Sequence, residues 1–195
     1  MMVLDIESLK DARITLSLIF INLLCFFLFN FALPEETFLL LVQYNKRIIE
    51  NFEVWRLFTS IFIHADIIHI FSNMIALLFF GATVENNPNI SKLQFLLIYF
   101  LSGLIGNLFS LFLLPLNSIS LGASGAIFGL LGVAFIIIAS DYQPLLFLAL
   151  IYIVFFIISS FTPGINYWAH IFGLLGGFLF GYFFYLRKRK DKLAY

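Results

Sequence analysis

Six long apolar segments run through this 195-residue chain and leave it few possible folds. Each is about 18 to 23 residues long, and a helix of that length crosses the roughly 30 Å hydrocarbon layer of a membrane. The composition agrees, because 62% of the residues are hydrophobic and 11% are charged, against about 25% charged residues in soluble domains. We therefore predict an all-α polytopic membrane protein, a bundle of six transmembrane helices. They are expected at about 14–33, 66–84, 92–114, 123–140, 144–161 and 167–186.

These segments divide the chain into three parts. Residues 14–186 form the expected membrane domain, between a tail at 1–13 and a basic tail at 187–195. We interpret the first segment as a membrane helix and not as a cleavable signal, because no small-residue cleavage site follows it. The connection 34–65 is too long for a turn and is rich in apolar residues, so it is expected to be a structured external loop.

Basic residues predict the orientation of the helices. Five of them follow the last segment, and Lys10, Arg13 and Lys92 fall on the same side of an even number of helices. Because basic loops stay in the cytoplasm, both termini are expected there, with the loop 34–65 outside the plasma membrane. The five are Arg187, Lys188, Arg189, Lys190 and Lys192.

Charge and cysteine content exclude several partners. The formal net charge is zero, which argues against a nucleic-acid partner. Cys25 is the single cysteine, so neither an intramolecular disulfide nor a thiolate zinc site can form. We expect no cofactor and no metal, and membrane lipid around the helices.

Three polar residues on different helices are expected at one depth in the membrane. His69, Ser124 and His170 each precede a charged residue at the cytoplasmic end of their helix by 16 or 17 residues. At the helical rise per residue they lie about 24–26 Å above the cytoplasmic boundary, just beneath the outer surface. Buried polar groups are costly in lipid, so this shared depth indicates a functional site. The charged markers are Glu85, Asp141 and Arg187.

Glycines recur on one face of the fourth segment and of the sixth. Small residues at this spacing let two helix backbones approach closely in lipid. Packing the two faces together would bring the Ser124 hydroxyl near the His170 imidazole. The glycines are Gly125, Gly129 and Gly132, and Gly173, Gly177 and Gly181.

Such a pair predicts nucleophilic chemistry. A neutral imidazole at His170 can take the proton of Ser124 and make its oxygen a nucleophile. The free backbone N–H groups at the start of the helix at Ser124, with His69 and Asn73 one turn apart on another helix, can donate to the developing oxyanion. Irregular backbone at 115–121 predicts a polar cavity open to the outside, which would supply water.

Short motifs follow one another in a specific order and on specific helices. They are Trp55-Arg56, His64, His69-x-x-x-Asn73, Gly81-Ala82-x-x-Glu85, Gly122-Ala123-Ser124-Gly125 and Ala169-His170-x-x-Gly173-x-x-x-Gly177. Each motif is weak alone, but together they resemble the rhomboid intramembrane serine proteases over nearly the whole chain.

The resemblance implies a serine endopeptidase in which Ser124 is the nucleophile and His170 the base, with no carboxylate third member. It implies an oxyanion hole made by His69, Asn73 and the backbone N–H of Ser124. Its substrates would be transmembrane proteins cut near the outer face of the membrane, and the fifth helix with its flanking loop would gate lateral access.

The same resemblance suggests supporting roles and shows two departures. Trp55 and Arg56 would stabilise the first loop, and Glu85 would join a structural hydrogen-bond network. Phe128 stands where family members often have tyrosine, and we expect its ring still to stack on the imidazole. Ser60 stands where some members have a second upstream histidine. We interpret His64 differently, as a residue whose side chain makes a hydrogen bond at a loop–helix junction.

Other functions fit the sequence less well. A transporter would need polar groups through the full membrane depth, whereas residues 133–139 are almost wholly apolar. A zinc protease needs HExxH, which is absent, and an aspartyl protease needs two carboxylates at one depth, whereas Asp66 and Asp141 fall at opposite faces. The remaining alternative is an inactive rhomboid-like scaffold that binds transmembrane clients.

Overall fold

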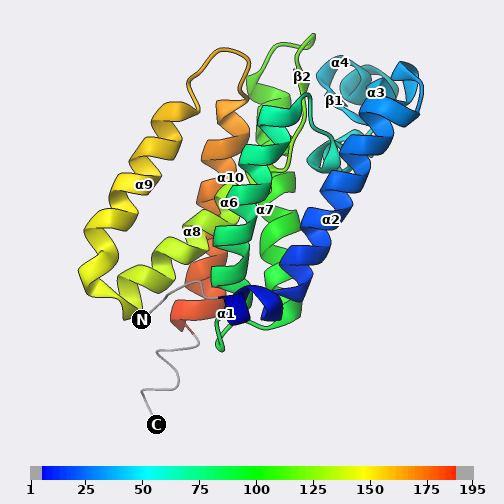
Figure 1. The fold of residues 1–195 in the computed structure, drawn as a ribbon. Coiled ribbons are helices and arrows are strands. Elements are labelled where there is room, and N and C mark those ends of the chain that lie inside the picture. The colour runs from blue at the N-terminus through cyan, green and yellow to red at the C-terminus, as the bar shows by residue number, and fades with distance from the viewer. Residues whose placement is uncertain (1–5, 188–195) are drawn as a thin grey trace.

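The computed structural model describes residues 6–187 as a bundle of helices (Figure 1). Within that range, five helices are long and apolar enough to cross a membrane, and a sixth apolar helix, Gln143–Ser159, is shorter. This confirms the predicted all-α polytopic fold. The tail residues Lys188, Arg189, Lys190 and Lys192, which contribute to the predicted orientation, lie outside the described residues.

The membrane helices are continuous except for short 3₁₀ and π turns at some ends. The first is α2 (Arg13–Phe27), which follows α1 (Ile6–Asp11) and is extended by the π turn η1 (Leu28–Ala32). Next come α6 (Ile67–Glu85), α7 (Lys92–Leu113) and α8 (Ser124–Asp141). The last are α9 (Leu146–Ser159), preceded by η3 (Gln143–Leu145), and α10 (Tyr167–Gly181), extended by η4 (Tyr182–Arg187).

Three helices end earlier than the hydropathy predicts, and α7 does so by a single residue, at Leu113. The first ends at Ala32, because Leu33 precedes a proline and takes an extended conformation. The fifth ends at Ser159, two residues before the predicted end, and the chain then turns through Pro163 and Gly164. Gly164 has a positive φ of 86°, which glycine adopts without strain.

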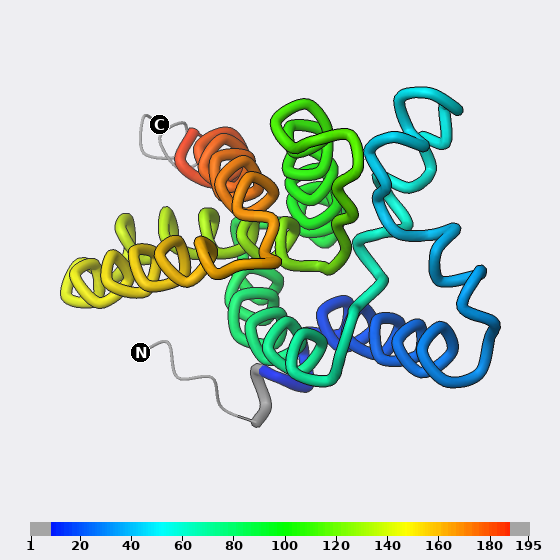
Figure 2. Tube along the Cα trace, turned by 90° about the horizontal axis from the view of Figure 1, so that it is seen from above, coloured from blue at the N-terminus to red at the C-terminus, as the bar shows by residue number. Residues whose placement is uncertain are grey.

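Helix α8 forms the centre of the bundle, with α9 at one edge (Figure 2). In an apolar window of α8, 61% of residues are buried inside the protein, against 17% for the first helix. Its glycine face packs directly on that of α10. A Cβ at Gly173 or Gly177 would overlap the backbone of Gly125 or Gly129 respectively, so only glycine permits this approach.

The segment between α2 and α6 is folded into short elements that lie at one end of the bundle (Figure 1). Its strand β1 (Gln43–Tyr44) pairs antiparallel with β2 (Ile119–Ser120), which comes shortly before α8. This pairing ties the loop to the backbone that leads into Ser124. The remaining elements are α3 (Glu35–Leu41), α4 (Asn45–Asn51), α5 (Arg56–Thr59) and η2 (Ser60–Phe62).

Glu85 joins the first two membrane helices at the opposite end. Its carboxylate accepts hydrogen bonds from the backbone N–H groups of Ile14 and Thr15, at 3.0 and 2.7 Å, and from the Thr15 hydroxyl at 2.8 Å. Lys92 Nζ lies 2.9 Å from the same carboxylate. Glu85 therefore caps the free N–H groups at the start of α2.

Candidate active site

Ser124 and His170 meet where α8 packs on α10. Ser124 is the first residue of α8, and His170 lies in the first turn of α10. The distance from Ser124 Oγ to His170 Nε2 is 2.7 Å, a short hydrogen bond. His170 is buried, while Ser124 is only partly covered. The close glycine contact between the two helices therefore holds a hydroxyl against an imidazole nitrogen.

The His170 ring has defined neighbours on its face and on its far edge. The Phe128 ring stacks on it, with the centroids 4.3 Å apart and the planes 11° from parallel. The second ring nitrogen, Nδ1, lies 2.7 Å from Ser160 Oγ at the end of α9. Ser160 could not be identified from the sequence, because a serine at the end of an apolar run is common and nothing local relates it to α10.

Gly122 makes room for His69 beside the start of α8. Gly122 has a φ of 117°, which side-chain-bearing residues rarely adopt. A Cβ at this position would also lie 2.7 Å from His69 Nε2. The backbone that leads into Ser124 can therefore pass closely against the imidazole of His69.

His69 and Asn73 border the same cavity as Ser124. The amide Nδ2 of Asn73 donates a hydrogen bond to the backbone carbonyl of His69, 3.0 Å away. A carboxamide nitrogen carries two hydrogens, so one of them is left for another acceptor. The arrangement brings two side chains of α6 that can donate hydrogen bonds to the cavity that Ser124 and His170 also line.

The cavity itself has a volume of about 690 Å³. Its polar lining comes from α6, α7, the start of α8, the end of α9 and α10, while Phe80, Leu131 and Phe156 make part of its apolar wall. The rings of Phe80 and Phe156 meet edge to face at 5.8 Å, where α6 approaches α9. The cavity thus has a polar part around Ser124 and His170 and an apolar part between α6 and α9.

His64 lies outside the membrane helices, with its ring centroid 5.0 Å from that of His69. Its side chain is fully buried, and its Nε2 accepts a 3.5 Å contact from the backbone N–H of Ala123. Burial, with a smaller effect of the neighbouring His69, lowers the pKa of His64 to about 3. His64 is therefore neutral at physiological pH and packs against the residue that precedes Ser124.

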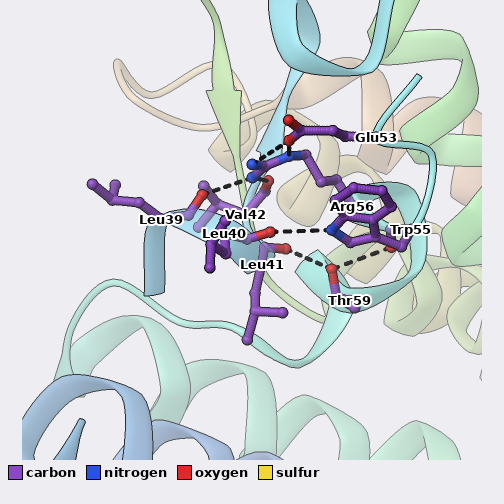
Figure 3. Close-up of polar contacts among 8 residues, drawn as sticks. All are labelled: Leu39, Leu40, Leu41, Val42, Glu53, Trp55, Arg56 and Thr59. Atoms are coloured by element: carbon purple, nitrogen blue, oxygen red, sulfur yellow. Dashed lines mark hydrogen bonds and ion pairs between the residues drawn. The ribbon is translucent and has the colours of Figure 1, made fainter. Parts of the chain in front are cut away.

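Arg56 organises the segment between α2 and α6 (Figure 3). Its Nη1 donates to the carbonyls of Leu39 and Val42 at 2.6 and 3.0 Å, and its Nε donates to Glu53 at 2.5 Å. The neighbouring Trp55 Nε1 donates to the carbonyl of Leu40 at 3.3 Å. These bonds satisfy carbonyls at the end of α3 that have no partner within the helix.

Potential metal ligands do not gather anywhere in residues 6–187. Across that range, no group of three or more His, Cys, Asp and Glu side chains could hold a metal ion.

Known proteins resemble this chain over most of its length. A sequence model of the Rhomboid domain matches residues 51–187. The chain is 34% identical over 171 residues to "Putative rhomboid protease YdcA" of Bacillus subtilis (strain 168). The alignment covers 82% of this chain and 83% of that protein.

Plant relatives match a shorter part of the chain. RHOMBOID-like protein 1 of Arabidopsis thaliana is 36% identical over 146 residues, 72% of this chain, and Inactive RHOMBOID-like protein 8 of the same plant is 37% identical over 141 residues, 69% of this chain. The alignments span 37% and 38% of the lengths of those two proteins. With six apolar helices in the described residues and this domain match, the chain is an integral multi-pass membrane protein that belongs to the rhomboid family.

Proposed function

We propose that this protein is an intramembrane serine endopeptidase that uses Ser124 and His170 as a catalytic dyad. The observation that carries the proposal is the 2.7 Å contact between Ser124 Oγ and His170 Nε2 at the edge of a cavity in the bundle. Membership of the rhomboid family and the likeness to a relative named as a protease support it.

The reaction would begin with transfer of the Ser124 hydroxyl proton to His170 Nε2. The oxygen then attacks the carbonyl carbon of the scissile peptide bond and forms a tetrahedral intermediate with a negative oxygen. His170 returns the proton to the departing amine nitrogen, which leaves an acyl-enzyme. A water molecule, deprotonated by His170, hydrolyses the ester and restores the hydroxyl.

The oxyanion needs donors that are already in position before reaction. The Ser124 backbone N–H, one of the free groups at the start of α8, points away from the helix. We assign His69 and Asn73 as side-chain donors, because both border the cavity beside Ser124. Loss of one such donor typically lowers the rate by about 10²–10³.

The proposed substrate is a transmembrane protein that enters from the lipid. Apolar residues of α6 and α9 face outward, including Ile68, Phe71, Phe147 and Phe155. Access would separate the Phe80 and Phe156 rings, where the two helices meet over the cavity.

We propose that both termini are cytoplasmic, with the membrane domain at 14–186, tails at 1–13 and 187–195, and the cavity open to the outside of the plasma membrane. The distribution of basic residues supports this orientation. In a variant with Cys25→Ser, a cysteine introduced at Asn117 should react with an impermeant reagent added outside, and one introduced at Lys188 should not. The reverse pattern would reject this orientation.

The dyad is tested with a fluorophosphonate probe that labels an activated serine. We expect the wild type and Ser17→Ala to be labelled, and Ser124→Ala and His170→Ala to remain unlabelled. Ser17 is a matched control, because it is an exposed helical serine that donates only to the carbonyl of Arg13. Labelling that persists in Ser124→Ala would reject Ser124 as the nucleophile.

An inactive scaffold is the second candidate, since one relative carries the name of an inactive protein. Such a scaffold would bind transmembrane clients, leave them uncut and take up no probe. A reconstituted transmembrane substrate that is cleaved by the wild type, but not by Ser124→Ala, would exclude it.

A further inference from the structure

The base has a second hydroxyl partner on the edge of its ring that faces away from Ser124. His170 Nδ1 lies 2.7 Å from Ser160 Oγ. Ser160 is the C-cap of α9 and is only 2% exposed. The Ser160 oxygen also lies 2.7 Å from the backbone carbonyl of Phe156, one turn earlier in α9. The Ser160 hydroxyl is thus shared between His170 and Phe156, and it lies in the wall of the cavity with almost no exposed surface.

The proton count favours one arrangement of these contacts. A serine hydroxyl has one proton to donate and two lone pairs to accept. If Nδ1 carries the ring proton, it donates to Ser160 Oγ, the Ser160 hydroxyl donates to Phe156, and Nε2 accepts from Ser124. Three hydrogen bonds then form a continuous chain.

The opposite tautomer makes fewer bonds. If Nε2 carries the ring proton, it donates to Ser124 Oγ, and Nδ1 must accept a hydrogen bond from the Ser160 hydroxyl. The carbonyl of Phe156 then loses that donor, and the Ser124 proton has no partner within the dyad. The described geometry therefore supports two bonds in this state instead of three.

We propose that Ser160 is a positioning residue that holds His170 in the tautomer with Nδ1 protonated and Nε2 free to accept. The inference rests on the proposed function, because only a base with a free Nε2 can activate Ser124. Phe128 restrains the plane of the ring, but stacking does not distinguish its two nitrogens. Ser160 makes that distinction.

Ser160 keeps its role when the proton moves. After Ser124 transfers its proton to Nε2, the imidazolium carries a proton on both nitrogens. The Nδ1–H bond to Ser160 then becomes charge-assisted, and such bonds are stronger than neutral ones. The Ser160 hydroxyl gains and loses no proton, so it acts on the reaction through His170.

Ser159 is a matched control within the same helix turn. Its hydroxyl donates to the carbonyl of Phe155 at 2.8 Å, as Ser160 does to Phe156. Ser159 is only half-buried, however, and its hydroxyl hydrogen bond stays within α9. Replacing each serine by alanine therefore removes the same helical bond, and only Ser160→Ala removes the partner of His170.

The direct test is ¹⁵N NMR of the imidazoles in detergent or nanodiscs. The chain has three histidines, so His170→Ala assigns the resonances of His170 by their loss. We expect a protonated Nδ1 and an unprotonated Nε2 in the wild type and in Ser159→Ala, and a mixture of tautomers in Ser160→Ala. A wild type with protonated Nε2, or the same tautomer in all three proteins, would overturn the inference.

Kinetics supply a second readout on a transmembrane substrate. Ser160→Ala should lower kcat by about three- to tenfold, the range for loss of one neutral hydrogen bond, with little change in KM. Ser160→Thr, which keeps a hydroxyl, should recover part of the loss. An unchanged kcat with Ser124→Ala inactive would reject the inference and leave the proposed function standing. A wild type without activity would reject the proposed function. The ¹⁵N spectra would still show whether Ser160 sets the tautomer of His170.

Discussion

The contact between α7 and α10 provides a quantitative test of how closely the bundle controls the dyad. Gly106 of α7 lies against the backbone of Ala169, the residue before His170. In Gly106→Ala the new Cβ would lie 2.5 Å from the Ala169 carbonyl oxygen. Relief from 2.5 Å to the 3.4 Å of ordinary contact requires a shift of about 0.9 Å between the two helices.

This shift falls directly on the catalytic base. Relief of the clash moves α10, which carries His170, away from α7 and so changes its position relative to Ser124 on α8. If the full shift is added to the 2.7 Å contact between Ser124 and His170, the distance becomes about 3.6 Å, which is no longer a hydrogen bond. A misplacement of about 1 Å can cost about 10²-fold in rate. We expect Gly106→Ala to react with a fluorophosphonate about 10²-fold more slowly, and overpacking to destabilise the protein by about 1–3 kcal/mol.

Gly176→Ala is the matched control, because Gly176 lies at the same helix pair. Its Cβ would meet Ser102 and Ile105 at 3.3 Å or more, so a shift of a few tenths of an ångström is enough. Alanine is the better helix former by about 1 kcal/mol, which offsets such a small cost. Labelling rates and thermal unfolding in detergent measure both effects. Equal labelling and unfolding of Gly106→Ala and Gly176→Ala would refute the reasoning.

Two further predictions concern stability. Arg56→Lys should destabilise the protein by about 1–3 kcal/mol, because one ammonium cannot replace the buried bonds to two carbonyls and Glu53. Thermal unfolding measures this loss, with Arg47→Lys as the control because the Arg47 side chain is exposed. Equal melting temperatures of the two variants would contradict the prediction. The folded-state pKa of His64, about 3, lies below its ordinary value of 6.5, so the unfolded chain takes up the proton first. His64 should leave stability unchanged above about pH 6.5 and reduce it by roughly 1 kcal/mol per pH unit as pH falls toward 3. Melting curves of the wild type and His64→Gln should diverge over this range, and parallel curves would argue against a neutral buried imidazole.

Features with a local cause could be predicted from the sequence. A run of about 20 apolar residues must satisfy its own backbone in lipid, and a helix does so within the segment. The predicted all-α membrane fold and the resemblance to the rhomboid family are both confirmed. Helix ends were predicted less well, because Leu33 and the turn after Ser159 depend on a nearby proline or glycine that hydropathy does not weigh.

The candidate site could be predicted in part. Motif spacing identified Ser124 and His170, and the structure brings them to 2.7 Å. Their catalytic role remains a proposal, as do the roles of His69 and Asn73. The contact of Ser160 with His170 could not be predicted, because it depends on how the end of α9 turns toward α10.

The sequence alone therefore determined that this protein lies in a lipid membrane, how many apolar helices it has and which residues are candidates for catalysis. Hydropathy and side-chain type are properties of each segment by itself. The tertiary structure decided which nitrogen of His170 meets which hydroxyl, which glycines contact the backbone of another helix and how the segment between α2 and α6 joins the start of α8. These contacts form between segments far apart in the chain, and a change of about 1 Å in helix packing is enough to make or break them.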